Sequence, residues 1–461
     1  MSTATSIREP YSVPQSDVEL TSLDWQRNEI AASSEHPTSS VNVQELPPVD
    51  EGRKAWLFCF SGFMLESLVW GFGFSYGIFQ GYYTSHPPFN TESHLAIAAV
   101  GPTALAVQYG AGIFLAFFYG RYPDLMKKSM WFGLALATSS LALSSFAKSV
   151  WLLIALQGVG LGFGGALCYW PVIFLVSQWF VQRKGLASGI VFAGSGIGGF
   201  LFPLFVNALL DRVGHAWTLR ILALVQVILG GIALLGVQPR IPPINYRRGQ
   251  QRPAFIPPRL QFFKRKVFWT FSATAFIQAM SYFPVSLYIA IFTATISSPL
   301  SATVVLSLFN SSGVVGQILI GYLSDKFPYP WIMFVSTMGS AIAAFLLWGF
   351  ADTLARVFAF AIIFGGLSGG FSSVTFAAAT EAANPNLEQA GMAASAATMF
   401  KGVAAVVGPI VSGILLEAGS KSVSTGPYGK FGFGSVEIFV GSCAVVGSMG
   451  SIAVLATRPR V

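Results

Sequence analysis

Between Ala55 and Thr457, long apolar stretches alternate with short polar breaks. An α-helix rises about 1.5 Å per residue, so about 20 residues cross the ~30 Å apolar core of a bilayer. Each apolar stretch is long enough for one crossing, and the pattern predicts twelve transmembrane helices. They occupy 55–80, 95–120, 129–147, 151–179, 184–210, 218–237, 267–294, 301–323, 331–350, 355–380, 392–416 and 435–457.

One polar break is far longer than the others. Pro239–Lys266 holds eight cations and no acid, with six apolar stretches on each side. The pattern predicts an all-α polytopic membrane protein built as two six-helix halves. The predicted parts are a disordered polar tail (1–54), a first half (55–237), a basic linker (238–266), a second half (267–457) and a short C-terminus (458–461).

The composition agrees with this interpretation. Hydrophobic residues make up 53% of the chain and charged residues only 10%, whereas soluble domains carry about 25% charged residues. Cys59, Cys168 and Cys443 lie far apart inside apolar stretches and have neither metal-site nor disulfide spacing. No nucleophile–base set and no paired intramembrane carboxylates are visible. We therefore expect no enzyme, no metal and no cofactor.

The net charge of +8 raises the question of nucleic acid, but its distribution argues against such a partner. If the N-terminus is cytoplasmic, 20 cations lie on the cytoplasmic side and four outside. This bias follows the positive-inside rule and places both termini in the cytoplasm. We expect a multi-pass protein of the plasma membrane, rather than of the vacuole or another internal membrane, that functions as a monomer.

Two glycine runs, Gly160–Gly165 and Gly194–Gly199, fit the spacing of a dinucleotide-binding loop. Such a site needs a strand before the glycines and an acid about 20 residues later. Neither is present. In apolar helices, small residues let helices pack closely, and we expect that role here.

Each half also carries a short polar turn after its second helix, with a glycine, an aspartate and a nearby cation. Glycine allows close helix approach, and aspartate can cap a helix N-terminus or pair with a cation. We expect these turns to hold the inward side shut and release it in turn. The residues are Gly120, Arg121, Asp124 and Lys127 in the first half and Gly321, Asp325 and Lys326 in the second.

The two turns resemble the Gly-x-x-x-Asp-(Arg/Lys) loop motif of the major facilitator superfamily. The resemblance to this superfamily covers residues 55–457. A sharper similarity is to the monocarboxylate porter family, especially its fungal members. The resemblance implies a secondary transporter whose halves rock about a midplane site. The segments similar to that family are Gln178–Ile190, Ala193–Gly199 with Pro203, Ser75–Gln80 and Gly408–Ile410.

Two charged residues inside predicted helices need a reason, because charge in hydrocarbon costs several kcal/mol. Glu66 lies near the middle of the first helix. Burial favours the protonated form of a carboxyl group, so Glu66 could carry a proton, or it could be a neutral group hydrogen-bonded to a neighbouring helix. Lys401 in the eleventh helix could attract an anion, pair with an acid, or extend to the membrane interface.

By the same resemblance, helices one, four, seven and ten line the cavity. Aromatic side chains with polar tips suit a cargo that is part apolar and part hydrogen-bonding, although packing is the better explanation for any single one of them. The further substrate-pathway candidates are Trp70, Phe74, Gln157, Tyr169, Gln278, Tyr282, Tyr288, Gln317, Ser372 and Thr375.

The chain departs from the family pattern at three positions. Phe74 stands where proton-linked monocarboxylate carriers have a lysine, and Gly313 and Gln317 take the places of an acid and a base. Glutamine donates hydrogen bonds but holds no fixed charge. The departures weaken the case for a lactate-like anion, and Glu66 with Lys401 is a possible substitute.

The sequence therefore predicts a secondary transporter that moves a small organic solute by alternating access, linked to protons, with export of a fungal metabolite favoured. Import of a monocarboxylate with a proton is the alternative. A nutrient sensor of the same fold is a third class, disfavoured by the short linker and C-terminus. The expected partners are the solute, protons and the lipid bilayer.

Overall fold

The computed structural model describes residues 46–244, 246, 251–258, 260–384, 389–420 and 426–458. Most of the predicted N-terminal tail and most of the predicted C-terminus lie outside the described residues. Three of the eight linker cations, Arg247, Arg248 and Arg259, lie outside the described residues.

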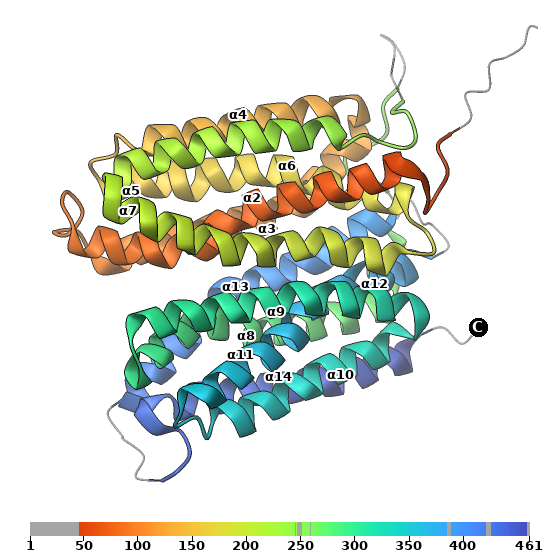
Figure 1. The fold of residues 1–461 in the computed structure, drawn as a ribbon. Helices are drawn as coiled ribbons and strands as arrows, with labels where there is room; N and C mark the ends of the chain where they lie inside the picture. The colour runs from red at the N-terminus through yellow and green to blue at the C-terminus, as the bar shows by residue number, and fades with distance from the viewer. Residues whose placement is uncertain are drawn as a thin grey trace, which may run out of the picture. The chain divides into compact units, whose positions relative to one another are not determined.

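Within the described ranges the chain is helical, without strands. Figure 1 shows the helices running side by side, with those from the first half grouped apart from those of the second. The helices are α2 (Gly52–Ser85), α3 (His94–Arg121), α4 (Met126–Ser144), α5 (Val150–Leu153), α6 (Leu161–Trp179), α7 (Lys184–Gly236), α8 (Lys266–Ile296), α9 (Pro299–Lys326), α10 (Tyr329–Ile342), α11 (Leu354–Gly370), α12 (Thr375–Ala383), α13 (Ala390–Ser420) and α14 (Gly434–Thr457).

Several of these elements combine into single crossings. α5 continues through the π-helical turn Ile154–Gly160 into α6, and α11 continues through the 3₁₀ turn Phe371–Val374 into α12. α10 is extended by the π-helical turn Ala343–Trp348. Three short 3₁₀ turns, at Pro123–Leu125, Gln261–Lys264 and Lys430–Gly432, lie between helices.

Ten helical stretches of the described chain are long and apolar enough to cross a membrane. One of them, α7, is two helices, because Gly214 has a φ of 73° that breaks the helical path. The 19 residues of α4 supply the remaining crossing. The predicted all-α fold is confirmed, and the expected total of twelve crossings is reached when α7 counts as two and α4 is included.

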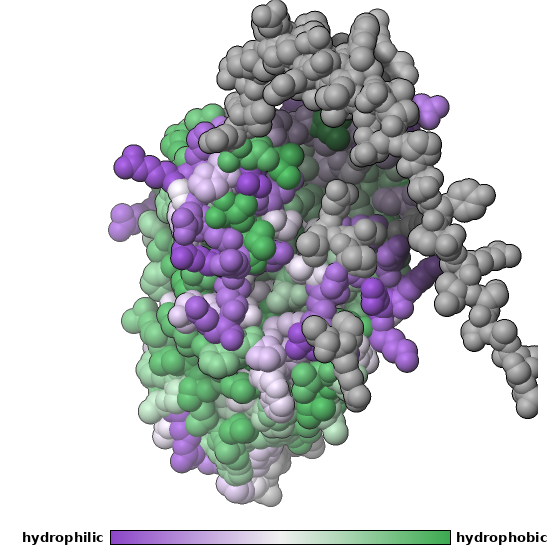
Figure 2. All heavy atoms as spheres, turned by 90° about the vertical axis from the view of Figure 1, so that its right-hand side faces the viewer, coloured by the Kyte–Doolittle hydropathy of each residue, from purple (hydrophilic) through white to green (hydrophobic). Residues whose placement is uncertain are grey.

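The described linker, from Val237 to Arg265, lies at one end of the bundle, here called the linker face. The turns before α4, α7 and α10 lie at the same end, and Figure 2 shows hydrophilic side chains gathered there. Arg252 forms an ion pair with Asp124 at 2.8 Å, which ties the linker to the turn between α3 and α4. The other end of the bundle is called the opposite face.

The start and end of the described chain are also fastened at the linker face. The Asp50 carboxylate accepts hydrogen bonds from the backbone N–H groups of Val181, Gln182 and Arg183, at 2.9–3.0 Å. Burial acts to raise the pKa of Asp50, but the three amide hydrogen bonds bring it below its ordinary value.

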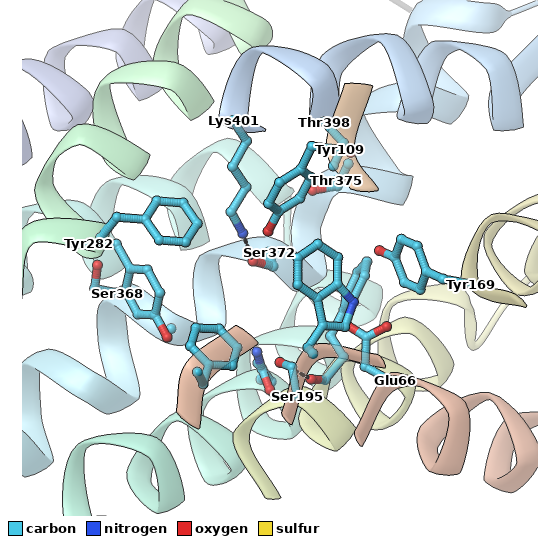
Figure 3. A pocket seen from close by; sticks show the side chains of 16 residues that line it. Glu66, Tyr109, Tyr169, Ser195, Tyr282, Ser368, Ser372, Thr375, Thr398 and Lys401 are labelled. Carbon is cyan, nitrogen blue, oxygen red and sulfur yellow. Dashed lines mark hydrogen bonds between the residues drawn. The ribbon is translucent and has the colours of Figure 1, made fainter. Parts of the chain in front are cut away.

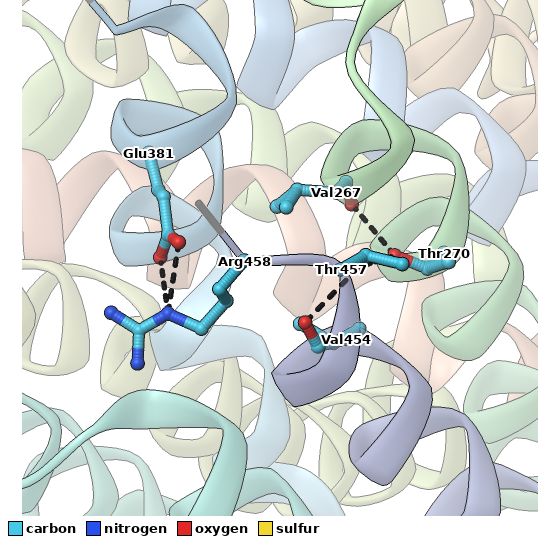
Figure 4. Close-up of polar contacts among 6 residues, drawn as sticks. All are labelled: Val267, Thr270, Glu381, Val454, Thr457 and Arg458. Carbon is cyan, nitrogen blue, oxygen red and sulfur yellow. Dashed lines mark hydrogen bonds and ion pairs between the residues drawn. The ribbon is translucent and has the colours of Figure 1, made fainter. Parts of the chain in front are cut away.

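At the C-terminal end, the Arg458 guanidinium donates to both carboxylate oxygens of Glu381 at 2.8 and 3.0 Å. Figure 4 shows this ion pair beside the hydroxyl contacts of Thr270 and Thr457. The end of α14 is therefore bound to the end of α12.

The apolar core differs between the two ends of the bundle. The largest cluster contains side chains of both halves, including Phe192 and Phe376, whose rings stack at 5.9 Å. Toward the opposite face there are two further clusters. One, around Phe79 and Tyr83, belongs to the first half, and the other, around Phe292 and Trp348, belongs to the second. The halves are therefore joined by shared packing at the linker end.

Glycines make the contact between the halves unusually close. α7 packs against α9, where a Cβ added at Gly189 would lie 2.3 Å from the backbone oxygen of Gln317. Gly185 and Gly321 oppose each other with similar closeness. Without side chains at these positions, two backbones meet directly. The predicted packing role is seen in the glycine run of α7 itself, where a Cβ added at Gly194 would lie 2.1 Å from the backbone oxygen of Phe63.

We predict that Gly189→Ala destabilises the arrangement in which the linker face is closed by about 1–3 kcal/mol, because a methyl group must displace the backbone of α9. Gly231→Ala, also in α7, is the control, since its nearest neighbour would be 3.9 Å away. Both changes gain the same helix propensity. Thermal unfolding should give a lower melting temperature for Gly189→Ala than for the control. Equal melting temperatures would contradict the backbone contact.

Candidate functional site

A cavity of about 50 Å³ lies between the two halves. Figure 3 shows that its side chains come from both halves and point toward one another. This volume has room for a few water-sized molecules, whereas sites for drug-sized solutes measure ~300 Å³ or more. The lining residues are Glu66, Trp70, Phe74, Tyr109, Tyr169, Phe192, Ser195, Tyr282, Phe283, Gln317, Ser368, Gly369, Ser372, Thr375, Thr398 and Lys401.

Glu66 and Lys401 are the two charged residues of this lining, and they come from opposite halves. Glu66 is 3% exposed, and its Oε2 has no hydrogen-bond partner among the described residues. The Lys401 ammonium donates to the Ser372 hydroxyl. The two groups are within electrostatic reach of each other, but no ion pair within 4.0 Å joins them in the described structure. An acid and a base therefore face one cavity without neutralising each other directly.

Aromatic rings form the wall beside Glu66. The Trp70 ring lies 4.5 Å from that of Tyr109 and 5.4 Å from that of Tyr169. Tyr109 also approaches Phe283 of the second half at 6.5 Å. The indole Nε1 of Trp70 is buried beside the Glu66 carboxyl group, although no well-aligned hydrogen bond joins it to a described residue. Flat apolar faces with unused polar atoms suit a solute that is partly aromatic and partly hydrogen-bonding.

Small hydroxyl side chains form the wall on the second half. Ser368, Ser372 and Thr375 are spaced four and three residues apart, so they follow one face of the α11–α12 crossing. Gln278 on α8 donates through Nε2 to the hydroxyl and the backbone oxygen of Ser368, both at 2.9 Å. Gln278 thus orients Ser368 from behind the cavity wall.

The structure brings most of the sequence-predicted residues to this cavity, but not all of them. Gln157 donates to the Tyr83 hydroxyl at 3.0 Å within the first half. Gln278 lies behind Ser368, and the Tyr288 hydroxyl donates to the backbone oxygen of Pro409 at 3.2 Å. The predicted residues at the cavity are Glu66, Trp70, Phe74, Tyr169, Tyr282, Gln317, Ser372, Thr375 and Lys401.

The sequence reasoning missed several lining residues that do carry a signal. Tyr109 is a polar aromatic residue in the middle of an apolar helix, on a helix that was not among the four expected to line the cavity. Thr398 precedes Lys401 by three residues, and Ser368 precedes Ser372 by four, so each shares a helical face with a predicted residue. Ser195 lies in the glycine run of α7, and Phe192 and Phe283 read as ordinary core residues.

The two polar turns contact different partners. In the first half, Arg252 holds the pKa of Asp124 below its ordinary value by donating hydrogen bonds to it. Arg121 donates to the Pro253 backbone oxygen at 3.0 Å, and Lys127 donates to the backbone oxygens of Leu234 and Val237. This turn therefore binds the linker and the end of α7, while a Cβ added at Gly120 would lie 3.2 Å from the Met392 side chain.

The turn of the second half binds the first half instead. Asp325 accepts hydrogen bonds from the backbone N–H groups of Gly185 and Leu186 at 2.7 and 2.8 Å. A carboxylate there satisfies the free N–H groups at the start of α7 and complements the helix dipole. Beside it, Gly321 packs on Gly185, and Lys326 lies over the Tyr322 ring at 5.8 Å.

The family follows from comparison with known proteins. Residues 59–309 and 273–460 match the model of the Major Facilitator Superfamily. The chain belongs to this superfamily. Superfamily members move solutes by alternating access, so the chain is a multi-pass membrane transporter and not an enzyme.

Similar proteins of the superfamily occur in fungi. The chain is 26% identical to the aspyridones efflux protein of Emericella nidulans, over 90% of this chain and 80% of that protein. It is 25% identical to the fujikurins efflux protein of Gibberella fujikuroi, over 91% and 86% of the two chains. An MFS-type transporter of Gibberella zeae is 28% identical over 74% and 75%.

Among solved structures, the chain shares its fold with a bacterial homologue of the human lysosomal transporter Spinster, in an inward-facing and unoccupied conformation. The TM-score is 0.58 at 15% identity, over 89% of this chain and 99% of that one. A likeness at this identity shows the fold alone.

We predict that Asp325→Ala opens the linker face, because it removes the carboxylate that caps α7 from the other half. Helix N-caps contribute about 0.5–2 kcal/mol. Spin labels at the exposed positions Arg183 and Lys326 would report the separation of the halves by pulsed electron resonance. The variant should show a larger population of long distances than the native chain.

Asp352→Ala is the matched control, since this aspartate pairs with Arg356 at the opposite face. An unchanged distance distribution in Asp325→Ala would show that the cap does not hold the halves together.

Proposed function

We propose that the chain exports a weakly charged organic solute in exchange for protons, with Glu66 as the proton-carrying group. The observation that carries the proposal is the position of Glu66. It is buried at a cavity between the halves, with a carboxylate oxygen that has no described partner, and it faces Lys401 across that cavity. The efflux proteins among the relatives support the direction of transport.

The cavity supports a mechanism in which proton and solute alternate. Burial among aromatic rings favours a neutral Glu66, which leaves Lys401 as the cation facing the solute. When Glu66 releases its proton, the carboxylate attracts Lys401 and competes with a solute for it. Proton binding and solute binding thus act on the same cation. Because the cavity measures only about 50 Å³, the halves must move apart before a solute enters.

The orientation belongs to the same proposal. The basic linker and both chain termini would lie in the cytoplasm, as the distribution of lysine and arginine supports. The conformation described here would then be closed toward the cytoplasm. We place the protein in the plasma membrane as a functional monomer, which suits export from the cell.

Membership in the monocarboxylate porter branch remains a finer proposal, and import of a monocarboxylate is the second candidate function. Lys401 favours it, because a cation at the cavity without a described carboxylate within 4.0 Å could bind a carboxylate solute. Against it, Phe74 and Gln317 line the cavity where that branch carries charge. Phe74 presents an apolar ring, and the Gln317 Oε1 is an unpartnered acceptor among the described residues.

Purified protein in liposomes with an enclosed pH-sensitive dye tests both functions. A panel of monocarboxylates and larger amphipathic organic acids would be added with and without a pH gradient. Proton movement opposite to one larger solute supports export, and movement together with a monocarboxylate supports the alternative. If the folded protein moves no protons with any solute of the panel, the result contradicts both transport functions and favours a sensor.

We predict that Glu66→Gln abolishes proton-coupled movement, because glutamine keeps the shape and hydrogen bonding of the acid but cannot release a proton. Solute exchange without a pH gradient should persist. Transport at several pH values, with melting temperature as the check on folding, measures the effect. A pH dependence equal to that of the native chain would exclude Glu66 as the carrier.

We predict that Lys401→Ala weakens the transport of anionic solutes about tenfold more than that of neutral ones, since a charge-assisted hydrogen bond contributes about 1.5–3 kcal/mol. Michaelis constants for a matched acid and amide measure the difference. Thr398→Ala, one turn away on the same cavity wall, is the control. Equal losses for both solutes would mark Lys401 as a structural residue.

A further inference from the structure

A second cavity, of about 700 Å³, lies at the linker face, apart from the site between the halves. One wall comes from α3, α4 and α6, and another from the start of the linker, Pro239–Ile244. Thr380, Gly391 and Met392 of the second half complete it. Its volume falls in the range of sites for drug-sized organic molecules, ~300–1,000 Å³.

Most of this lining is apolar and adaptable. Met126, Met130 and Met392 contribute flexible thioether side chains, which fit ligands of varied shape. Phe174 and Leu175 add to the same surface. A cavity with such walls favours the burial of a hydrocarbon chain or ring system.

Three cations stand in the wall of this apolar cavity, and none forms an ion pair with a described carboxylate. Lys127 donates to the backbone oxygens at the end of α7. Lys184 donates to the Thr380 hydroxyl at 3.1 Å, and Arg240 donates to the Pro47 backbone oxygen at 2.7 Å. The one acid of the lining, Asp124, is already paired with Arg252. The cavity therefore combines apolar walls with cations that form no direct ion pair, although Asp50 and Asp325 lie near enough to Lys184 to act on its charge.

The rim of the cavity is apolar where it meets the surroundings. Val181, Ile241 and Ile244 line it and are 61%, 50% and 64% exposed. Exposed apolar side chains that gather in one place mark sites of membrane or ligand contact, and we infer that this rim borders the lipid leaflet. A ligand from that leaflet could enter without crossing a polar surface.

We propose that this cavity binds an amphipathic anion from the adjoining lipid leaflet, with one hydrocarbon chain among the methionines and a carboxylate or phosphate headgroup at Lys184 and Arg240. The geometry also assigns an effect on transport. Because the walls come from both halves, the ligand fits only while the linker face is closed, and its binding stabilises that state. The site is independent of the proton role of Glu66.

The test uses the full chain in nanodiscs of uncharged phosphatidylcholine. The probe is palmitic acid that carries a photoactivatable diazirine, and the matched neutral probe is hexadecanol with the same group. After illumination, mass spectrometry of peptides locates the labels. We expect the acid to label segments 126–130, 174–178 and 239–244 about tenfold more than the alcohol does, as a charge-assisted contact implies.

Two variants probe the two features of the site separately. Arg240→Gln removes a headgroup cation, and Met130→Trp fills the cavity at a side chain that is 1% exposed while keeping every cation. Each should reduce labelling by palmitic acid several-fold. Arg356→Gln, at the opposite face, should not. Melting temperatures establish that the variants fold, and either variant alone can decide the outcome if the other does not.

Several results would overturn the proposal. Equal labelling by acid and alcohol would remove the role of the cations, and labels outside the three segments would remove the site. Labelling that neither variant reduces would also exclude the site. Loss of labelling in millimolar inorganic phosphate would show recognition of a free anion rather than a lipid. If palmitic acid fails to shorten the distance between spin labels at Arg183 and Lys326, the effect on the linker face is wrong.

Discussion

Direct backbone contact between α7 and α9 is the constraint on which the rest of this conformation depends. Gly185 and Gly189 allow it, and Asp325 fastens it by capping α7 from the second half. The other side of α7 packs on the first crossing, where Gly194 approaches the Phe63 backbone oxygen and the Cβ of Glu66. One helix thus contacts the closed linker face and the proposed proton site, so a shift of α7 must disturb both.

The same packing explains why the cavity is small. With the halves in backbone contact at the linker end, aromatic rings from α2, α3 and α8 approach one another across the interface. Glu66 and Lys401 remain within electrostatic reach of each other in a cavity with little room for water. Charges in such surroundings interact more strongly than in solvent. In the proposed mechanism, the contracted state therefore strengthens the effect of one proton at Glu66 on Lys401.

Helix spans and the position of Glu66 could be predicted from the sequence because both depend on distance along the chain. Hydrophobic length fixes where a crossing begins and ends, and a residue in its middle lies near the midplane. The rotation of each helix about its own axis, which decides which side chains face the cavity, could not be predicted in this way. Gln157 and Tyr288 were expected at the cavity, yet they bond to Tyr83 and Pro409 within their own halves. Helices that are apolar on all sides carry no periodic signal of which face is inward.

The sequence also could not predict that α3 contributes to the cavity, because α3 was not among the helices expected to line it. Tyr109 reaches the cavity because α3 contacts α13 of the other half, where an added Cβ at Gly402 would lie 2.3 Å from the Tyr109 side chain. That contact joins residues nearly 300 positions apart in the sequence. No local pattern records such a pairing, and only the packed structure reveals it.

The fastening of Asp50 has a practical consequence for work with shortened chains. Its carboxylate satisfies three backbone amides in the turn that leads directly into α7, and the Pro47 oxygen binds Arg240 of the linker. Five residues ahead of the first crossing therefore belong to the folded unit. A boundary drawn at the hydrophobic edge, near Ala55, would remove them and loosen a turn over a hundred residues away. Expression designs that trim the N-terminus should keep the chain from Pro47 onward.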